Sequence, residues 1–138
     1  MDGKRLFTGA AVGAVTQMVV GSLIFLFFFS DFYAANSGGV SGISREMPII
    51  WAATLGHLSL ATLLTLAIVK TDSVSLVRGL KVGALVGFLI WFGTDFIHYA
   101  ATYRFNLTVT ILDPLLETIR FGASGAMIGL VLGRLTKE

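Results

Sequence analysis

The sequence predicts an all-α, polytopic membrane protein with four transmembrane helices. Its 138 residues are 55% hydrophobic and only 13% charged, whereas a soluble domain carries about 25% charged residues. Four apolar runs each reach the length of about 20 residues that a helix needs to cross a hydrocarbon core of roughly 30 Å. Most basic residues lie in the segments that fall on one side of the membrane, and this predicts that both termini are cytoplasmic. The length fits a single four-helix domain, residues 1–138.

The first three helices follow directly from the apolar runs. The first covers about residues 6–29. Lys4 and Arg5 precede it, as basic residues precede the apolar region of a signal peptide. This apolar run is longer than the roughly 7 to 15 apolar residues of a signal peptide, so we expect a retained helix. The second and third helices are expected at about residues 48–69 and 80–101.

The start of the fourth helix has two interpretations. Asp113 followed by Pro114 is a typical helix start, because Asp accepts free backbone N–H groups and proline at the first position has no N–H to lose. In this interpretation Asp113 is a helix cap, the helix covers about residues 114–133, and residues 104–112 (RFNLTVTIL) form an extended or re-entrant link. The alternative begins the helix near Asn106, with Pro114 inside it and the following charges deep in the bundle. We adopt the first interpretation as the prediction.

The orientation follows from the Lys and Arg residues at the helix ends. Only Arg45 and Arg104 fall on the outer side. Seven basic residues fall on the inner side: Lys4, Arg5, Lys70, Arg78, Lys81, Arg134 and Lys137. We therefore expect both termini on the cytoplasmic side, and we expect the protein in the inner membrane of a bacterium or archaeon. The outer side then holds a long connection at residues 30–47, which is rich in Gly and Ser and is expected to be mobile.

Glycines recur every four residues and predict close helix packing. Such small-xxx-small stripes, or glycine zippers, let helix backbones approach where lipid supplies no hydrophobic drive. The stripes are Gly9, Gly13 and Gly21, then Gly79, Gly83 and Gly87, then Gly125, Gly129 and Gly133. They lie mostly toward the cytoplasmic side, so we expect any cavity in the outer half. The second stripe could also serve an outward face, so we expect a homo-oligomer or a partner in a membrane complex.

Two segments carry a family resemblance. The run LVRGLKVGALVGF and the later run ILDPLLETIRFGASGAMIGLVLG, with the polar-tipped third helix between them, resemble an uncharacterised family of small four-helix membrane proteins, domain of unknown function 1761. The resemblance covers roughly the last 65 residues, and the first two helices match only in layout. It implies a four-helix membrane protein and implies no activity.

Five ionisable residues are expected to share one pocket in the outer half of the bundle. They are His57, Asp95, His98, Glu117 and Arg120. At about 1.5 Å per helical residue, they lie between about 5 and 13 Å below the outer ends of their helices. Charged groups in a lipid core are costly unless they pair or face the bundle interior, so each is a candidate functional residue.

Several functions fit this pattern. Proton, ion or small-solute translocation would use the polar layer directly. A metal site could use the two histidines with Asp95 and Glu117, but the paired Glu-x-x-His motifs of di-iron bundles are absent and Arg120 adds positive charge. Haem fits less well, because His57 and His98 differ in depth by about 8 Å. A structural or accessory subunit is the remaining alternative.

Other classes are disfavoured by what the chain lacks. No catalytic triad spacing, phosphate loop or dinucleotide fingerprint is present, which argues against an enzyme and leaves the cofactor and the metal unknown. With no cysteine there is no disulfide or thiol nucleophile. The basic residues flank apolar runs and form no surface stripe, so the expected partners are the lipid bilayer and membrane proteins, and not nucleic acid.

Overall fold

The computed structural model describes residues 2–36, 42, 45, 47–71 and 74–135, and these residues form helices and connecting segments without a strand. Four helices are long and apolar enough to cross a membrane, and they extend over Gly3–Phe28, Ile50–Val69, Leu76–Ala101 and Leu107–Leu135. The all-helical fold with four candidate spans is therefore confirmed. These features are compatible with an integral membrane protein.

The first span consists of two kinds of helix. The α-helix α1 covers Gly3–Ser22 and continues as the π-helix η1, Leu23–Phe28. A short helix, α2, Ser30–Asn36, follows it. Residues 30–36 were expected to belong to a long connection, and the structure instead folds them into this helix; the mobility of the connection stays a prediction. Most of the rest of this connection, including the Gly- and Ser-rich stretch, lies outside the described residues.

The second and third spans begin and end near the predicted residues. Helix α3 covers Ile50–Val69 and helix α4 covers Leu76–Ala101. The start of α4 is capped by Ser75, whose side chain accepts a hydrogen bond from the backbone N–H of Arg78. Helix α4 thus gains one turn that the apolar run alone does not indicate.

The prediction of Asp113 as a helix cap is wrong. Helix α5 covers Leu107–Leu135 and contains Pro114 in its interior. Asn106 caps it instead, because its side-chain oxygen accepts a hydrogen bond from the backbone N–H of Val109 at 3.0 Å. Pro114 removes the helical hydrogen bond to the carbonyl of Thr110. The alternative interpretation, with Asp113 and the following charges deep in the bundle, is the one observed.

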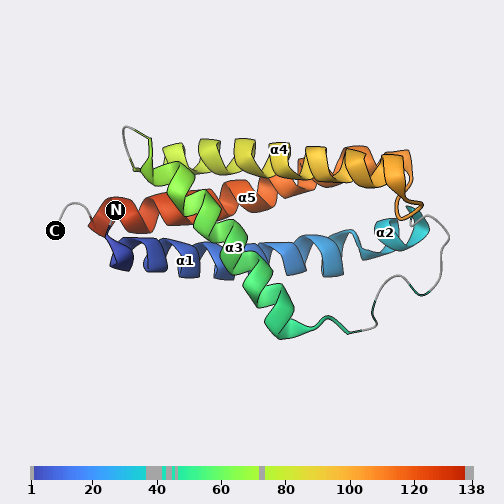
Figure 1. Ribbon diagram of the computed structural model, residues 1–138, viewed down its shortest axis with the longest axis horizontal. Coiled ribbons are helices and arrows are strands. Elements are labelled where there is room, and N and C mark those ends of the chain that lie inside the picture. The colour runs from blue at the N-terminus through green and yellow to red at the C-terminus, as the bar shows by residue number, and fades with distance from the viewer. Residues whose placement is uncertain (1, 37–41, 43–44, 46, 72–73, 136–138) are drawn as a thin grey trace.

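The helices form a bundle in which α5 is the most buried element (Figure 1). Its strongest contact is with α4, beside which it runs along most of its length, and α1 packs against both α3 and α5. The start of α1 and the end of α5 lie at the same end of the bundle (Figure 1). We call this the terminal end and the opposite end, where α2 lies, the pocket end.

Glycines bring α4 and α5 into backbone contact. A Cβ added to Gly83 would overlap the backbone oxygen of Phe121, and one added to Gly79 would overlap that of Gly125. The stripe on α4 is thus buried against α5 of the same chain, and it does not form an outward face. Because these contacts lie toward the terminal end, that half of the bundle is closed.

The apolar core lies in this closed half. Five fully buried side chains form it: Leu64, Ile68, Phe121, Ile128 and Leu132. Helix α3 joins the core only through its second half, because its buried residues begin at Ala61. Its first half exposes Trp51 and Leu55 and diverges from α4 and α5 (Figure 1). The pocket end is consequently the looser half of the bundle.

Candidate functional site

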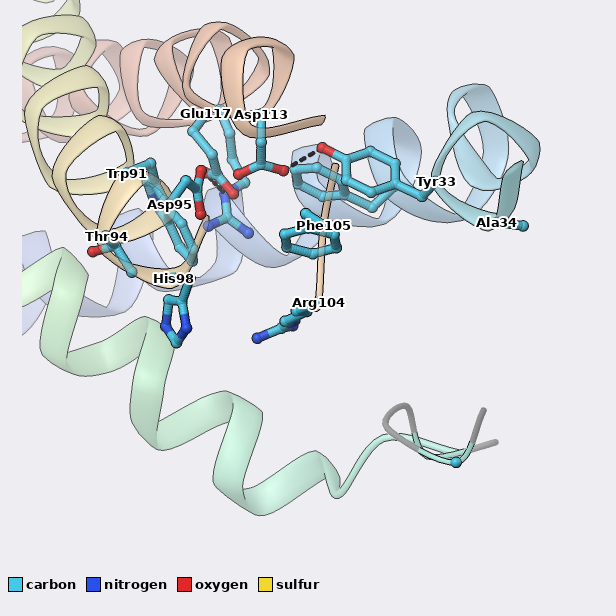
Figure 2. Close-up of a pocket in the computed structure, with 13 residues that line it drawn as sticks. Tyr33, Ala34, Trp91, Thr94, Asp95, His98, Arg104, Phe105, Asp113 and Glu117 are labelled. Atoms are coloured by element: carbon cyan, nitrogen blue, oxygen red, sulfur yellow. Dashed lines mark hydrogen bonds and ion pairs between the residues drawn. The ribbon is translucent and has the colours of Figure 1, made fainter. Parts of the chain in front are cut away.

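Three acidic side chains converge at the pocket end. Asp95 comes from α4, and Asp113 and Glu117 come from adjacent turns of α5. Their exposed fractions are only 3%, 6% and 2%. Figure 2 shows their carboxyl groups pointing toward one another, and the side chains of Asp95 and Asp113 lie within hydrogen-bonding range. The site is therefore a buried carboxyl cluster with one member that the sequence analysis assigned to a helix cap.

Helical periodicity explains how these residues meet. Side chains three, four or seven residues apart lie on one face of an α-helix. Trp91, Asp95 and His98 share such a face on α4, and Asp113, Glu117 and Arg120 share one on α5. The glycine contact between α4 and α5 brings the two helices close enough for the two polar faces to meet.

Arg120 supplies the buried positive charge of the cluster. Its Nε lies 2.7 Å from a carboxylate oxygen of Glu117, three residues earlier on α5. This contact is a buried ion pair. The guanidinium carbon also lies 5.5 to 5.6 Å from the ring centroids of Phe25, Trp91 and Phe121. Cation–π attraction to these rings partly replaces the water that Arg120 has lost.

Gly21 makes room for this arginine. A Cβ at Gly21 would lie 3.1 Å from both Cδ and an Nη atom of Arg120. The sequence analysis assigned Gly21 to a packing stripe, but its neighbour is the arginine side chain and not a helix backbone. Gly21 thus positions a charged group of the site.

Asp113 has a partner on α2. The hydroxyl group of Tyr33 donates a hydrogen bond to Asp113 (Figure 2). Burial, together with this contact, raises the pKa of Tyr33 well above its ordinary value, so its proton remains on the phenol. Helix α2 is fixed to the start of α5 by a second contact, in which the side-chain amide of Asn106 donates to that of Asn36 at 2.9 Å.

A cavity of about 660 Å³ borders the cluster. Four of the five predicted residues line it, namely Asp95, His98, Glu117 and Arg120. Asp113 and Arg104 line it as well, together with the aromatic side chains of Phe25, Tyr33, Trp91 and Phe105. The walls come from η1, α2, α4, α5 and the link between α4 and α5, and His98 is at an exposed position.

His57 is the predicted residue that the structure places elsewhere. It is half-buried on α3, and its Nδ1 lies 3.3 Å from the side-chain oxygen of Gln17 on α1. It does not line the cavity. The contact links α1 to α3 across the bundle, so His57 is a packing residue next to the site.

Two polar atoms of the pocket have neither a hydrogen-bond partner nor an ion-pair partner among the described residues. One is the Oδ2 oxygen of Asp95, and the other is the indole N–H of Trp91. Buried polar atoms without a partner are costly and uncommon. The pocket therefore presents both an acceptor and a donor that a ligand or water could satisfy.

The described residues contain no group of three or more His, Asp or Glu side chains arranged to hold a metal ion. His57 does not line the cavity that the carboxyl cluster borders, and Arg120 occupies the side of Glu117 on which a cation would otherwise sit. These observations weaken the metal-site alternative from the sequence analysis.

Sequence reasoning missed two central residues, Tyr33 and Asp113. Tyr33 stands in a connection that was expected to be mobile, although Ser30 and Asp31 before it are typical of a helix start. Asp113 was assigned to the helix cap because Pro114 follows it. The polar spacing from Asp113 to Glu117 and Arg120 was the signal that could have placed it in the site.

Comparisons with protein-family models, with curated proteins and with solved structures give no match to this chain. The resemblance to domain of unknown function 1761 therefore stays a prediction, and the function has to be argued from the site.

Proposed function

We propose that this protein is an integral membrane protein that binds a proton at the Asp95–Asp113 pair and couples it to translocation of an ion or small solute. The observation that carries the proposal is the contact between these two buried carboxyl groups. Two carboxylates in contact in a medium of low dielectric constant repel each other strongly, so one of them retains a proton unless a cation approaches.

The surrounding charges favour a single shared proton. Glu117 is compensated by Arg120 at 2.7 Å. The other basic residue that lines the cavity among the described residues is Arg104, which is exposed and whose guanidinium carbon lies 4.9 Å from the ring centroid of Phe105. Asp113 already accepts a hydrogen bond from Tyr33. We therefore propose that Asp95, which has neither of these partners, carries the proton.

The form of the bundle supports translocation over a purely structural role. The pocket end is open and polar, whereas the terminal half is closed by glycine contacts and apolar side chains. A protein that is open at one end and closed at the other has the form of one state of an alternating-access cycle. The excess of basic residues near the terminal end favours a cytoplasmic location for it, so the pocket would open outward.

Association with other chains is part of the proposal. Four helices of this size enclose little space, and a translocation path through the closed half would be easier to form at an interface between copies. Since the α4 glycine stripe is occupied by α5, such an interface would have to use another face.

The proton-binding step can be tested by counting protons. Wild-type protein and the Asp95→Asn variant, each in nanodiscs, would be titrated through the same pH range with the same lipid. We expect the wild type to bind about one proton more than the variant, because asparagine cannot accept it. Equal proton uptake would refute the proposed proton site.

A further inference from the structure

We infer that the pocket binds a monovalent organic cation whose apolar groups pack against aromatic side chains. Each bound cation replaces one proton of the carboxyl cluster. The inference rests on the proposed function, since it uses the same carboxyl pair. It adds the class of ligand and the stoichiometry of exchange.

The charge balance sets the ligand charge at one. Among the groups that line the cavity, Asp95, Asp113 and Glu117 are acidic, and Arg104 and Arg120 are basic. Three ionised carboxyl groups and two guanidinium groups, with Tyr33 protonated, give the pocket one net negative charge. One bound proton makes it neutral, and so does one monovalent cation.

The remaining free position in the cluster is on Asp95. Glu117 pairs with Arg120, and Asp113 accepts from Tyr33. The Oδ2 atom of Asp95 is buried without a partner among the described residues, and the residue lines the cavity. A cation in the cavity would thus meet the carboxylate that has lost its proton.

The size and the walls of the cavity favour an organic ligand. A volume of about 660 Å³ is in the range of pockets for drug-sized molecules and far exceeds that of a bare ion. Tyr33, Trp91 and Phe105 contribute aromatic surface next to the acidic cluster. Aromatic faces attract organic cations and also bury their apolar groups. A small inorganic ion would instead need several close oxygen or nitrogen ligands, and no metal-binding group occurs in the described part of the chain.

The exchange balances in charge and atoms. The protonated pocket and the free cation give the cation-bound pocket and one proton in solution. In the bound state the Asp95 carboxylate is the counter-ion of the ligand. The groups that face the exchanging pair are Glu117 and Arg120 on α5, Tyr33 on α2, His98 on α4 and Arg104 in the link.

Tetraphenylphosphonium is a suitable probe, because it is monovalent, aromatic and unable to bind or release protons. The protein in nanodiscs, in weakly buffered solution at neutral pH, would be titrated with the probe while a pH indicator records released protons. We expect saturable binding with about one proton released per bound cation. Asp95→Asn should lower the affinity at least tenfold and abolish the release. Asp31→Asn, which changes an exposed carboxyl group on α2, should leave both unchanged.

Each outcome separates the two proposals. Binding no tighter than partitioning into empty nanodiscs, or binding without proton release, would overturn this inference while the proton count of the wild type still stood. If the wild type and Asp95→Asn took up equal numbers of protons in the titration without the probe, the proposed function itself would be refuted. Should Asp95→Asn fail to fold, as judged by thermal unfolding, Asp113→Asn is the second test: it removes the neighbouring carboxylate that keeps the proton on Asp95, so the cation should still bind but release no proton, and proton release equal to that of the wild type would overturn the inference.

Discussion

Replacing Arg120 by leucine tests the electrostatics of the site most sharply. The substitution leaves Glu117, which is 2% exposed, without the cation that lies 2.7 Å away. Breaking a buried ion pair from one side costs about 3 to 5 kcal/mol. Because the pair borders a cavity, water can reach part of it, and we expect a loss of about 3 kcal/mol, at the lower end of that range.

The matched experiment is a double-mutant cycle. Glu117→Gln combined with Arg120→Leu removes both charges, so the double variant should recover most of the loss. Asp95→Asn combined with Arg120→Leu should recover less, since Asp95 makes no ion pair with Arg120 within the described residues. Thermal or denaturant unfolding in one detergent would compare six proteins, namely the wild type, the three single variants and the two double variants.

The loss should also depend on pH. In Arg120→Leu the unpaired carboxylate can be neutralised by a proton, which is available at low pH and scarce at high pH. The destabilisation relative to wild type should therefore shrink as the pH falls and grow as it rises. Strictly additive losses in the double variant with Glu117, or a loss independent of pH, would refute the ion-pair reasoning.

Three further predictions follow from the packing, from the Tyr33 contact and from the orientation. Gly83→Leu should prevent the close contact of α4 with α5 and lower the unfolding temperature strongly, whereas Gly93→Leu, where an added Cβ meets nothing within 4 Å, should not; equal effects would contradict the packing. Tyr33→Phe should lower the free energy of unfolding by about 1 to 3 kcal/mol, because a buried acceptor loses its donor, and an unchanged value would show that the bond contributes nothing. In this cysteine-free chain, an impermeant thiol reagent applied to whole cells should label Tyr103→Cys and not Leu135→Cys; the reverse pattern would invert the proposed orientation.

The existence of the four long helices could be predicted from the sequence because it depends on the length of the apolar runs. That signal is summed over about 20 residues, so no single residue decides it. Helix α3 illustrates this, since its observed bounds, Ile50–Val69, differ by only two residues from the prediction at the first end.

The start of α5 could not be decided from the sequence, because two local signals compete. Asp113 with Pro114 and Asn106 with the residues after it both resemble helix starts. The outcome depends on tertiary contacts that no local pattern contains: Asn106 is held by Asn36, and Asp113 finds its donor in Tyr33. Both partners belong to α2, which the sequence analysis did not predict.

The candidate site was predicted in part for the same reason. Asp95, His98, Glu117 and Arg120 were identified because charged groups stand out within apolar helices, and the structure brings them to one cavity. His57 carried the same signal, yet it lies on the diverging helix α3 and contacts Gln17 instead. The depth of a residue along its helix can be counted from the sequence, but the tilt of that helix cannot.

The central claim is that Asp95 and Asp113 together hold one exchangeable proton. Infrared difference spectroscopy of the protein in lipid detects it directly, because the carbonyl stretch of a protonated carboxylic acid is separate from the bands of carboxylates. We predict a protonated-acid band at neutral pH in the wild type that disappears in Asp95→Asn and on addition of tetraphenylphosphonium. A wild-type spectrum at neutral pH without that band would contradict the account.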